Sequence, residues 1–230
     1  METKPHVLIN GRPEACIDPS DRGFQYGDGV FTTLRVIRGI PLLGLEHLKR
    51  LQRDASRIRL PPFDEEVLHR EMTELSRKCP QGILKIQLSR GVSGRGYQIP
   101  ESPFPTRFLS IRPTVPFSAE LPVALNLRVS EQRLSLNPLL SGIKHMNRLE
   151  QIMARMEWDD PKIDESLMMD MEGFVIEGTM TNLFLFKDGA LMTPRVDRCG
   201  VQGVLRDCVL RLARNRGIEV IETRLKLSSL

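Results

Sequence analysis

The sequence predicts an α/β (α+β) protein of two domains, and three observations lead to this fold class. A chain of 230 residues is long enough for one large domain or two small ones with their own cores. Segments with strand-like and helix-like hydrophobic patterns are mixed in both halves of the chain. Residues 113–122 contain three prolines, which is typical of a linker. We therefore expect an N-terminal domain at 1–112 and a C-terminal domain at 123–230.

In the first half, hydrophobic runs bounded by turn residues predict strands. Asn10-Gly11 and Arg38-Gly39 are the turn signals, and a polar loop covers 18–29. The expected strands are 6–10, 12–17, 30–37, 40–43, 82–89 and 107–112. One helix is predicted by apolar residues at helical spacing, namely Leu45, Leu48, Leu51, Ala55 and Ile58. A second helix is expected over 64–77, with Asp64 as its N-cap residue.

The second half begins with an expected strand at 123–129. Helical spacing of Leu149, Ile152, Met153 and Met156 predicts a helix. A β-rich region follows at 165–193, with turns at Glu172-Gly173 and Asp188-Gly189. The last expected elements are a helix at 204–215 and a strand at 219–223.

Composition excludes several classes of protein. The net charge is only +4 and the aromatic content only 5%, so a nucleic-acid-binding surface has little support. No apolar run is long enough to cross a bilayer, and the N-terminus does not resemble a signal peptide. The four cysteines are dispersed, as are the histidines, which argues against disulfides and zinc. We expect a cytoplasmic protein that binds a small-molecule substrate in a cleft between its domains.

Lys144 is the first candidate for chemistry. It follows Ser141-Gly142 and lies in the approach to the predicted helix or in its first turn, where the helix dipole disfavours a cation. A lysine with a lowered pKa can attack a carbonyl group as a neutral amine. The alternative is a solvated lysine, which is the commoner situation.

Three further features could belong to the same site. Glu177 lies at the end of a predicted strand, where it either projects into a cleft or is an ordinary turn carboxylate. A glycine-containing loop at 193–206 opens a helix, and free amides at a helix start suit a phosphate. Its spacing is not a dinucleotide or Walker fingerprint. Arg50 lies on the polar side of its helix, where it is either solvated or grips a phosphate.

Together these features resemble the pyridoxal-phosphate enzymes of the branched-chain and D-amino-acid aminotransferase group, the class IV aminotransferases of fold type IV. The resemblance covers nearly the whole chain and keeps the order of the motifs. It implies that Lys144 holds pyridoxal 5'-phosphate covalently and that Glu177 pairs with the protonated pyridine nitrogen. It implies a phosphate site formed by Arg50 and by the turn Gly203, Val204 and Leu205. It also implies a homodimer.

Within this group the sequence is most similar to the lyase branch, whose members convert aminodeoxychorismate to 4-aminobenzoate and pyruvate for folate synthesis. The matching sequence segments are SDRGFQYGDGVFTTLR at 20–35, LK at 84–85, SRGVSGRGY at 89–97 and GIKHMNRLEQ at 142–151. The resemblance implies, by position, that Thr33 is the catalytic hydroxyl and that Lys85 and Arg95 face the substrate carboxylates. Two cations suit a dicarboxylate. The alternative for Arg90 and Arg95 is a solvated surface loop.

Two departures from the resemblance keep other functions open. Leu205 stands where aminotransferases often have a threonine, and the chain ends at Leu230, earlier than the relatives do. One rival is a transaminase acting on D- or branched-chain amino acids with the same cofactor. The other is a binding protein with little or no catalysis.

Overall fold

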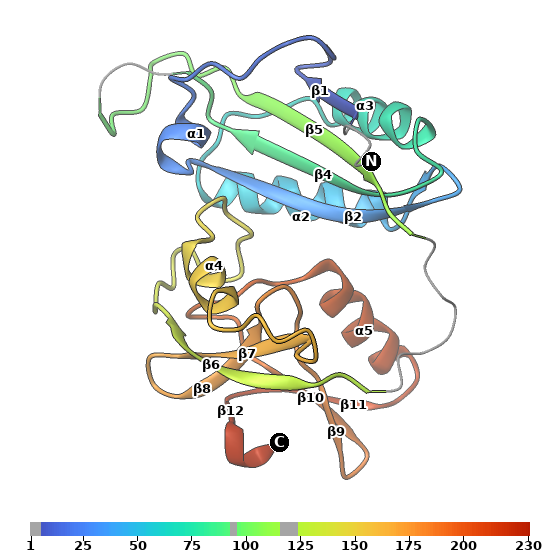
Figure 1. Ribbon diagram of the computed structural model, residues 1–230, viewed down its shortest axis with the longest axis vertical. Coiled ribbons are helices and arrows are strands. Elements are labelled where there is room, and N and C mark those ends of the chain that lie inside the picture. The colour runs from blue at the N-terminus through green and yellow to red at the C-terminus, as the bar shows by residue number, and fades with distance from the viewer. Residues whose placement is uncertain (1–5, 93–95, 116–123) are drawn as a thin grey trace. The chain divides into compact units, whose positions relative to one another are not determined.

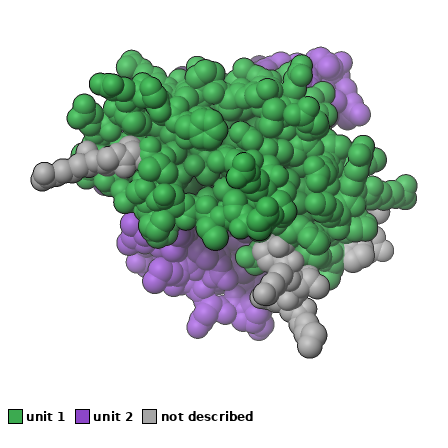
Figure 2. Space-filling model, turned by 90° about the horizontal axis from the view of Figure 1, so that it is seen from above, with its two compact units in different colours: residues 1–119, 144–147 green, residues 120–143, 148–230 purple. Residues whose placement is uncertain are grey.

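The computed structural model describes residues 6–92, 96–115 and 124–230. The chain divides into two compact units, coloured separately in Figure 2. Unit 1 consists of residues 1–119 and 144–147, and unit 2 of residues 120–143 and 148–230. Residues 116–122 of the expected linker lie outside the described residues. The sequence predicted that residues 123–230 form one domain. In the structure, residues 144–147, which include Lys144, belong to the first unit instead.

Unit 1 is built on a five-stranded antiparallel sheet of order β1-β5-β4-β2-β3 (Figure 1). The strands are β1 (His6–Ile9), β2 (Gly29–Ile37), β3 (Ile40–Pro41), β4 (Gln81–Ser89) and β5 (Thr106–Pro113). The helices are α1 (Arg22–Tyr26), α2 (Gly44–Arg57) and α3 (Glu65–Arg77). Helix α2 packs on β2, and α3 packs on β5 and β1. Alternate residues of β2, β4 and β5 are buried, as expected for a sheet with one covered face.

Local signals set several boundaries of unit 1 as predicted. The Asp64 carboxylate accepts hydrogen bonds from the amides of Glu66 and Val67 and caps α3. Arg38 and Gly39 both have positive φ, 52° and 73°, and they join β2 to β3 in a tight hairpin.

Two strand predictions in unit 1 are wrong. Residues 12–17 form no strand, since only one bridge joins Ile9 to Arg12 and β1 pairs with β5 instead. Pro13 interrupts that segment and offers no backbone donor. The strand expected at 40–43 ends at Pro41, because Leu43 turns into the left-handed region (φ 53°) just before α2.

Unit 2 contains two sheets, a four-stranded one of order β12-β8-β7-β6 and a three-stranded one of order β11-β10-β9 (Figure 1). The strands are β6 (Leu127–Leu134), β7 (Glu165–Asp170), β8 (Phe174–Gly178), β9 (Leu185–Lys187), β10 (Ala190–Pro194), β11 (Glu219–Thr223) and β12 (Leu225–Lys226). The helices are α4 (Leu149–Arg155) and α5 (Val204–Asn215), followed by the 3-10 turn η1 (Leu227–Ser229). Helix α5 connects the parallel strands β10 and β11.

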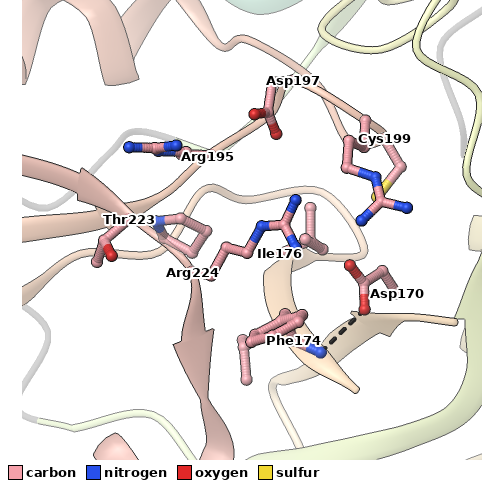
Figure 3. Close-up of a pocket in the computed structure, with 11 residues that line it drawn as sticks. Asp170, Phe174, Ile176, Arg195, Asp197, Cys199, Thr223 and Arg224 are labelled. Atoms are coloured by element: carbon pink, nitrogen blue, oxygen red, sulfur yellow. Dashed lines mark hydrogen bonds between the residues drawn. The ribbon is translucent and has the colours of Figure 1, made fainter. Parts of the chain in front are cut away.

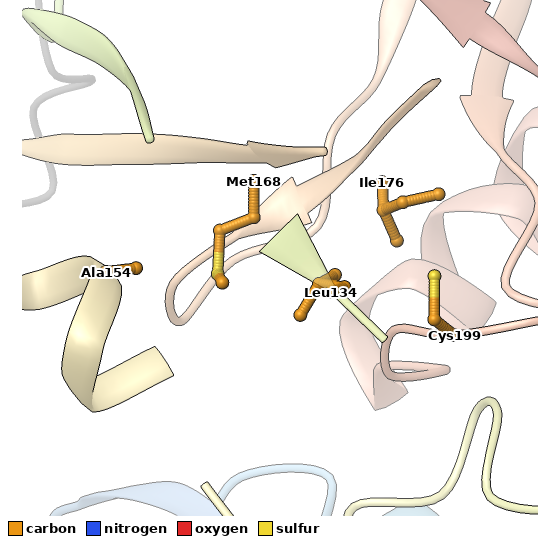
Figure 4. Packing of buried hydrophobic residues seen from close by; sticks show 5 residues of the cluster. All are labelled: Leu134, Ala154, Met168, Ile176 and Cys199. Atoms are coloured by element: carbon orange, nitrogen blue, oxygen red, sulfur yellow. The ribbon is translucent and has the colours of Figure 1, made fainter. Parts of the chain in front are cut away.

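The core of unit 2 gathers side chains from strands, helix and loop (Figure 4). One buried cluster consists of Leu134, Ala154, Met168, Ile176 and Cys199. Helix α5 and strand β11 have the predicted limits, and the turn at Asp188-Gly189 joins β9 to β10. The strand expected at 123–129 is instead Leu127–Leu134, and residue 123 lies outside the described residues.

Helix α4 does not use the apolar stripe that predicted it. Leu149, Ile152, Met153 and Met156 are all exposed, and Ala154 is the buried residue of the helix. In the described part of the chain, no helix has the length and apolar character needed to cross a membrane.

Candidate active site

Lys144 lies in an extended segment paired with the first residues of β2. The Phe31 amide donates to the Lys144 carbonyl at 2.9 Å, and the Met146 amide donates to the Gly29 carbonyl at 2.9 Å. Between these bonds, His145 forms an antiparallel bridge with Val30. Helix α4 begins only at Leu149, so Lys144 is not in its first turn. The sheet, and not a helix terminus, fixes the main chain of this lysine.

One face of the sheet in unit 1 brings together three of the predicted site residues. The Lys144 and Lys85 ammonium groups lie 4.8 Å and 5.0 Å from the centroid of the Phe31 ring. Thr33 pairs directly with Lys85 across β2 and β4 and lies on the same face of β2 as Phe31. Burial lowers the pKa of Lys85. This face thus presents two amines over one aromatic ring, with a threonine of the same strand beside them.

Arg50 is buried, so the solvated alternative for this residue of α2 is wrong. It donates to the Phe31 carbonyl at 3.3 Å and to the Thr32 hydroxyl. That hydroxyl lies 2.6 Å from Nδ1 of His47. Burial lowers the pKa of His47 to about 4, and the charges of Arg50 and Lys144 add to the shift. The imidazole is therefore neutral at pH 7, and the face of α2 turned to the sheet is polar at these positions.

Three residues of the matching segments, Arg22, Asp28 and Arg90, have a structural role in this chain. Arg22 and Arg90 are buried and both form ion pairs with Asp28, at 2.7 Å and 2.8 Å. Burial would raise the pKa of Asp28, but the two guanidinium groups hold it below its ordinary value. Arg90 is thus not the solvated loop residue of the alternative interpretation. Arg95 lies outside the described residues.

Glu177 is a buried carboxylate at the end of β8 in unit 2. It accepts a hydrogen bond from the Val201 amide at 2.9 Å. The Asn182 side chain donates to the Val201 carbonyl at 2.9 Å and lies 3.5 Å from the carboxylate. Burial lowers the pKa of Arg148, and the charges of Glu177 and Glu150 oppose that shift. Glu177 is therefore held in place among polar groups, unlike an ordinary exposed turn residue.

A second carboxylate, Glu165, organises the turn that follows Glu177. It accepts hydrogen bonds from the amides of Thr179 and Met180 and from the hydroxyls of Thr179 and Thr181. Burial would raise the pKa of Glu165, but these bonds outweigh it and keep the pKa below its ordinary value. Sequence reasoning missed both Glu165 and Asn182, because their partners are set by the turn geometry and not by a local pattern.

The predicted phosphate turn is the N-terminus of α5. Gly203 is the N-cap residue, and Val204 begins the helix as expected. A side chain at Gly203 would collide with the Asn182 amide oxygen, so the loop needs glycine there for space. The Gln202 amide donates to the Gly142 carbonyl at 3.0 Å. Within unit 2, the residues just before the lysine therefore run alongside the loop that opens α5.

A surface pocket of unit 2 contains none of the predicted site residues (Figure 3). Its lining includes Arg195, Arg198 and Arg224 together with Asp170 and Asp197. Arg198 and Arg224 are paired with Glu172. Burial raises the pKa of Cys199, another lining residue, to about 12, so its thiol stays protonated. Within the described ranges, no group of His, Cys, Asp and Glu side chains could hold a metal ion.

Comparison with known proteins identifies the class. The family model for amino-transferase class IV matches residues 29–230, and the chain belongs to this family. An aminodeoxychorismate lyase of Vibrio harveyi is 34% identical over 223 residues, covering 92% of this chain and 79% of the relative. The predicted family resemblance and fold class are thus confirmed.

Two solved structures extend the comparison. The 4-amino-4-deoxychorismate lyase of Pseudomonas aeruginosa has a TM-score of 0.89 and 36% identity, covering 96% of this chain and 82% of that one. A branched-chain amino acid aminotransferase of T.th. with pyridoxamine 5'-phosphate has a TM-score of 0.83 and 25% identity, covering 97% of this chain and 78% of that one. Pyridoxal 5'-phosphate is the cofactor of this family.

The residues of this chain fit that cofactor. Glu177 is a buried, hydrogen-bonded carboxylate, as a protonated ring nitrogen requires. Gly203 keeps the start of α5 free of a side chain, which suits a phosphate. Lys144 carries a primary amine on a main chain hydrogen-bonded to β2, and such an amine can bond covalently to an aldehyde.

Proposed function

We propose that this protein is a pyridoxal-phosphate-dependent lyase that converts 4-amino-4-deoxychorismate to 4-aminobenzoate and pyruvate, a step of folate synthesis. The observation that carries the proposal is the face of unit 1 on which Lys85 and Lys144 lie over the Phe31 ring and Thr33 pairs with Lys85. A dicarboxylate substrate needs cations beside the reacting amine, and this face provides one. The similarity to two aminodeoxychorismate lyases supports the same activity.

One group of site residues holds the cofactor. When bound, pyridoxal phosphate supplies an electron sink for charge that develops at the carbon bearing the substrate nitrogen. Glu177 pairs with the protonated ring nitrogen. Arg50 and the amides at Gly203, Val204 and Leu205 bind the phosphate. Leu205 offers only its amide, because its exposed side chain carries no hydroxyl.

The substrate is held and converted by the residues of unit 1. Lys85 and Arg95 bind its carboxylates. Lys144 removes the proton from the carbon bearing the nitrogen as a general base. The departing enolpyruvyl group takes up a proton to become pyruvate, and either Lys144 or the Thr33 hydroxyl delivers it. The ring that remains is aromatic, which drives the step forward.

The wider setting of the enzyme forms part of the proposal. The family resemblance supports a homodimer, and the free cysteines support a reducing, cytoplasmic compartment. Sedimentation of the active protein at assay concentration should give the mass of a dimer. An active monomer would contradict this part of the proposal.

An aminotransferase is the second candidate, because a branched-chain aminotransferase shares the fold at 25% identity. The two activities differ in their need for a second substrate. Transamination consumes a keto acid and leaves the cofactor in its amine form, whereas the lyase needs no keto acid.

The decisive experiment supplies aminodeoxychorismate without a keto acid. Pyruvate and 4-aminobenzoate should appear in equal amounts. Thr33→Ala should lower pyruvate release by about a hundredfold, as loss of a positioned proton donor does, and should lower D-alanine transamination less. Thr73→Ala is the matched control, because its hydroxyl bonds the His69 carbonyl on α3. Absence of pyruvate together with rapid transamination would make the protein an aminotransferase.

A further inference from the structure

Helix α2 turns an unusual set of polar side chains toward the sheet of unit 1. His47, Arg50 and Asp54 are buried and follow one another at steps of three and four residues, so they lie on one face of the helix. Buried polar groups destabilise a fold unless they are hydrogen-bonded. His47 and Arg50 meet Thr32 of β2. The third member of the stripe, Asp54, has a different partner.

Asp54 contacts the main chain of Lys144. Its side chain is fully buried, and Oδ2 accepts the Lys144 amide at 3.0 Å. The other oxygen, Oδ1, pairs with the Arg53 guanidinium at 2.9 Å. The Lys144 carbonyl accepts the Phe31 amide. Both main-chain polar groups of the lysine are therefore bonded, its amide to α2 and its carbonyl to β2.

We infer that Asp54 is a positioning residue for Lys144. A charge-assisted bond to the amide is stronger than a neutral one, and it fixes the point from which the lysine side chain extends. The side chain itself can still rotate about its four carbon–carbon bonds. The link to catalysis rests on the proposed function, because it assumes that Lys144 performs the chemistry.

Hydrogen exchange of the cofactor-free protein tests the contact itself. Exchange of the Lys144 amide should be about ten- to a hundredfold faster in Asp54→Ala, the loss expected for a bond to a charged acceptor. Asp54→Asn keeps an acceptor oxygen and should retain most of the protection. Arg53→Gln is the matched control, since it removes the ion pair but leaves the carboxylate. Unchanged exchange in Asp54→Ala, or equal acceleration in Arg53→Gln, would overturn the inference.

Borohydride trapping then tests the role of the contact. Added pyridoxal phosphate is reduced onto Lys144 and the modified peptide is measured by mass spectrometry, which does not depend on the reaction catalysed. Asp54→Ala should trap the cofactor about tenfold more slowly, since the amine extends from a less firmly held main chain, and Asp54→Asn should restore the rate. With aminodeoxychorismate, kcat should fall by a similar factor while KM changes less. Faster exchange with unchanged trapping would overturn the positioning role and make Asp54 a purely structural residue. If the wild type traps the cofactor but releases no pyruvate, the proposed reaction fails while the positioning role stands.

Discussion

The two units hold their principal site residues in opposite ways. In unit 1, the main chain of Lys144 is bonded to Asp54 and Phe31, while its amine lies over the face of the Phe31 ring. In unit 2, the side chain of Glu177 is itself held by the Val201 amide. The difference matches the work proposed for each residue. A lysine that carries protons must move, whereas a carboxylate that pairs with a ring nitrogen must keep its orientation.

The variant expected to have the largest effect removes the lysine side chain of unit 1. Lys144→Ala should lower pyruvate release by about a thousandfold or more, since it deletes both the covalent attachment and the general base. The fold should survive, because β2 and Asp54 bond the main chain at this position. A thermal unfolding midpoint close to that of the wild type would confirm that the variant is folded. Lys49→Ala, an exposed lysine of α2, is the control. Turnover within about tenfold of wild type would contradict the assignment.

Removing the negative charge of the Glu177 carboxylate should have the next largest effect on pyruvate release. Glu177→Gln retains an oxygen that can accept the Val201 amide, so the geometry should persist and only the negative charge is lost. We expect pyruvate release to fall by about a hundredfold while equilibrium dialysis still detects cofactor binding. Glu219→Gln, on the exposed edge of β11, should have no effect. Equal turnover in the Glu177 and Glu219 variants would refute the electron-sink role.

The scaffold of unit 2 can be tested separately through Glu165. The Thr179 and Met180 amides donate to different oxygens of Glu165, so the NH2 group in Glu165→Gln would face one of these two donors. Leaving buried groups unsatisfied should lower the free energy of unfolding by about 2 kcal/mol, as measured by urea denaturation. Glu131→Gln, an exposed residue of β6, should change it by less than about 0.5 kcal/mol. Similar stabilities for the two variants would mean that the turn does not depend on this carboxylate.

The polar stripe of α2 should leave a signature in the pH dependence of stability. The pKa of His47 is lowered from 6.5 to about 4 in the folded state. As pH falls, the unfolded chain therefore binds this proton first, and the folded state loses stability from about pH 6.5 down to about pH 4. Between about pH 7 and pH 4.5 the wild type should lose about 2 kcal/mol more than His47→Gln. Parallel stability curves for the two proteins would show that His47 is not buried in neutral form.

Local signals predicted the parts of the fold that depend on neighbours in sequence. Asp64 caps α3 as expected, and α5 begins after Gly203, because caps and helix starts are determined within a few residues. The face of α2 was predicted less well. Leu45 belongs to the predicted apolar stripe but is exposed, whereas Arg50 is buried. The hydroxyl that accepts Arg50 belongs to Thr32 on another element, and helical periodicity carries no information about that partner.

In the candidate site, too, the contacts between residues distant in sequence were not predicted. Lys144 and Glu177 were identified from the sequence, but the contacts that hold them were not. Lys144 meets Phe31 and Asp54, which are distant from it in the chain, and Glu165 meets Thr179 through a turn. Such contacts arise only when strands and helices are assembled. The roles assigned to all of these site residues remain predictions, and the variants above test those of Lys144, Glu177 and Thr33.

The assignment of residues 144–147 to unit 1 has a consequence for recombination between relatives. The chain passes between the units after residues 119, 143 and 147, so a crossover placed in the proline-containing segment separates β2 from the strand-like segment that pairs with it. A chimera made there would receive its lysine and His145 from one parent and Gly29–Phe31 from the other. Exchange of a whole unit therefore requires a second graft, of residues 144–147, and Lys144 is inherited with that graft.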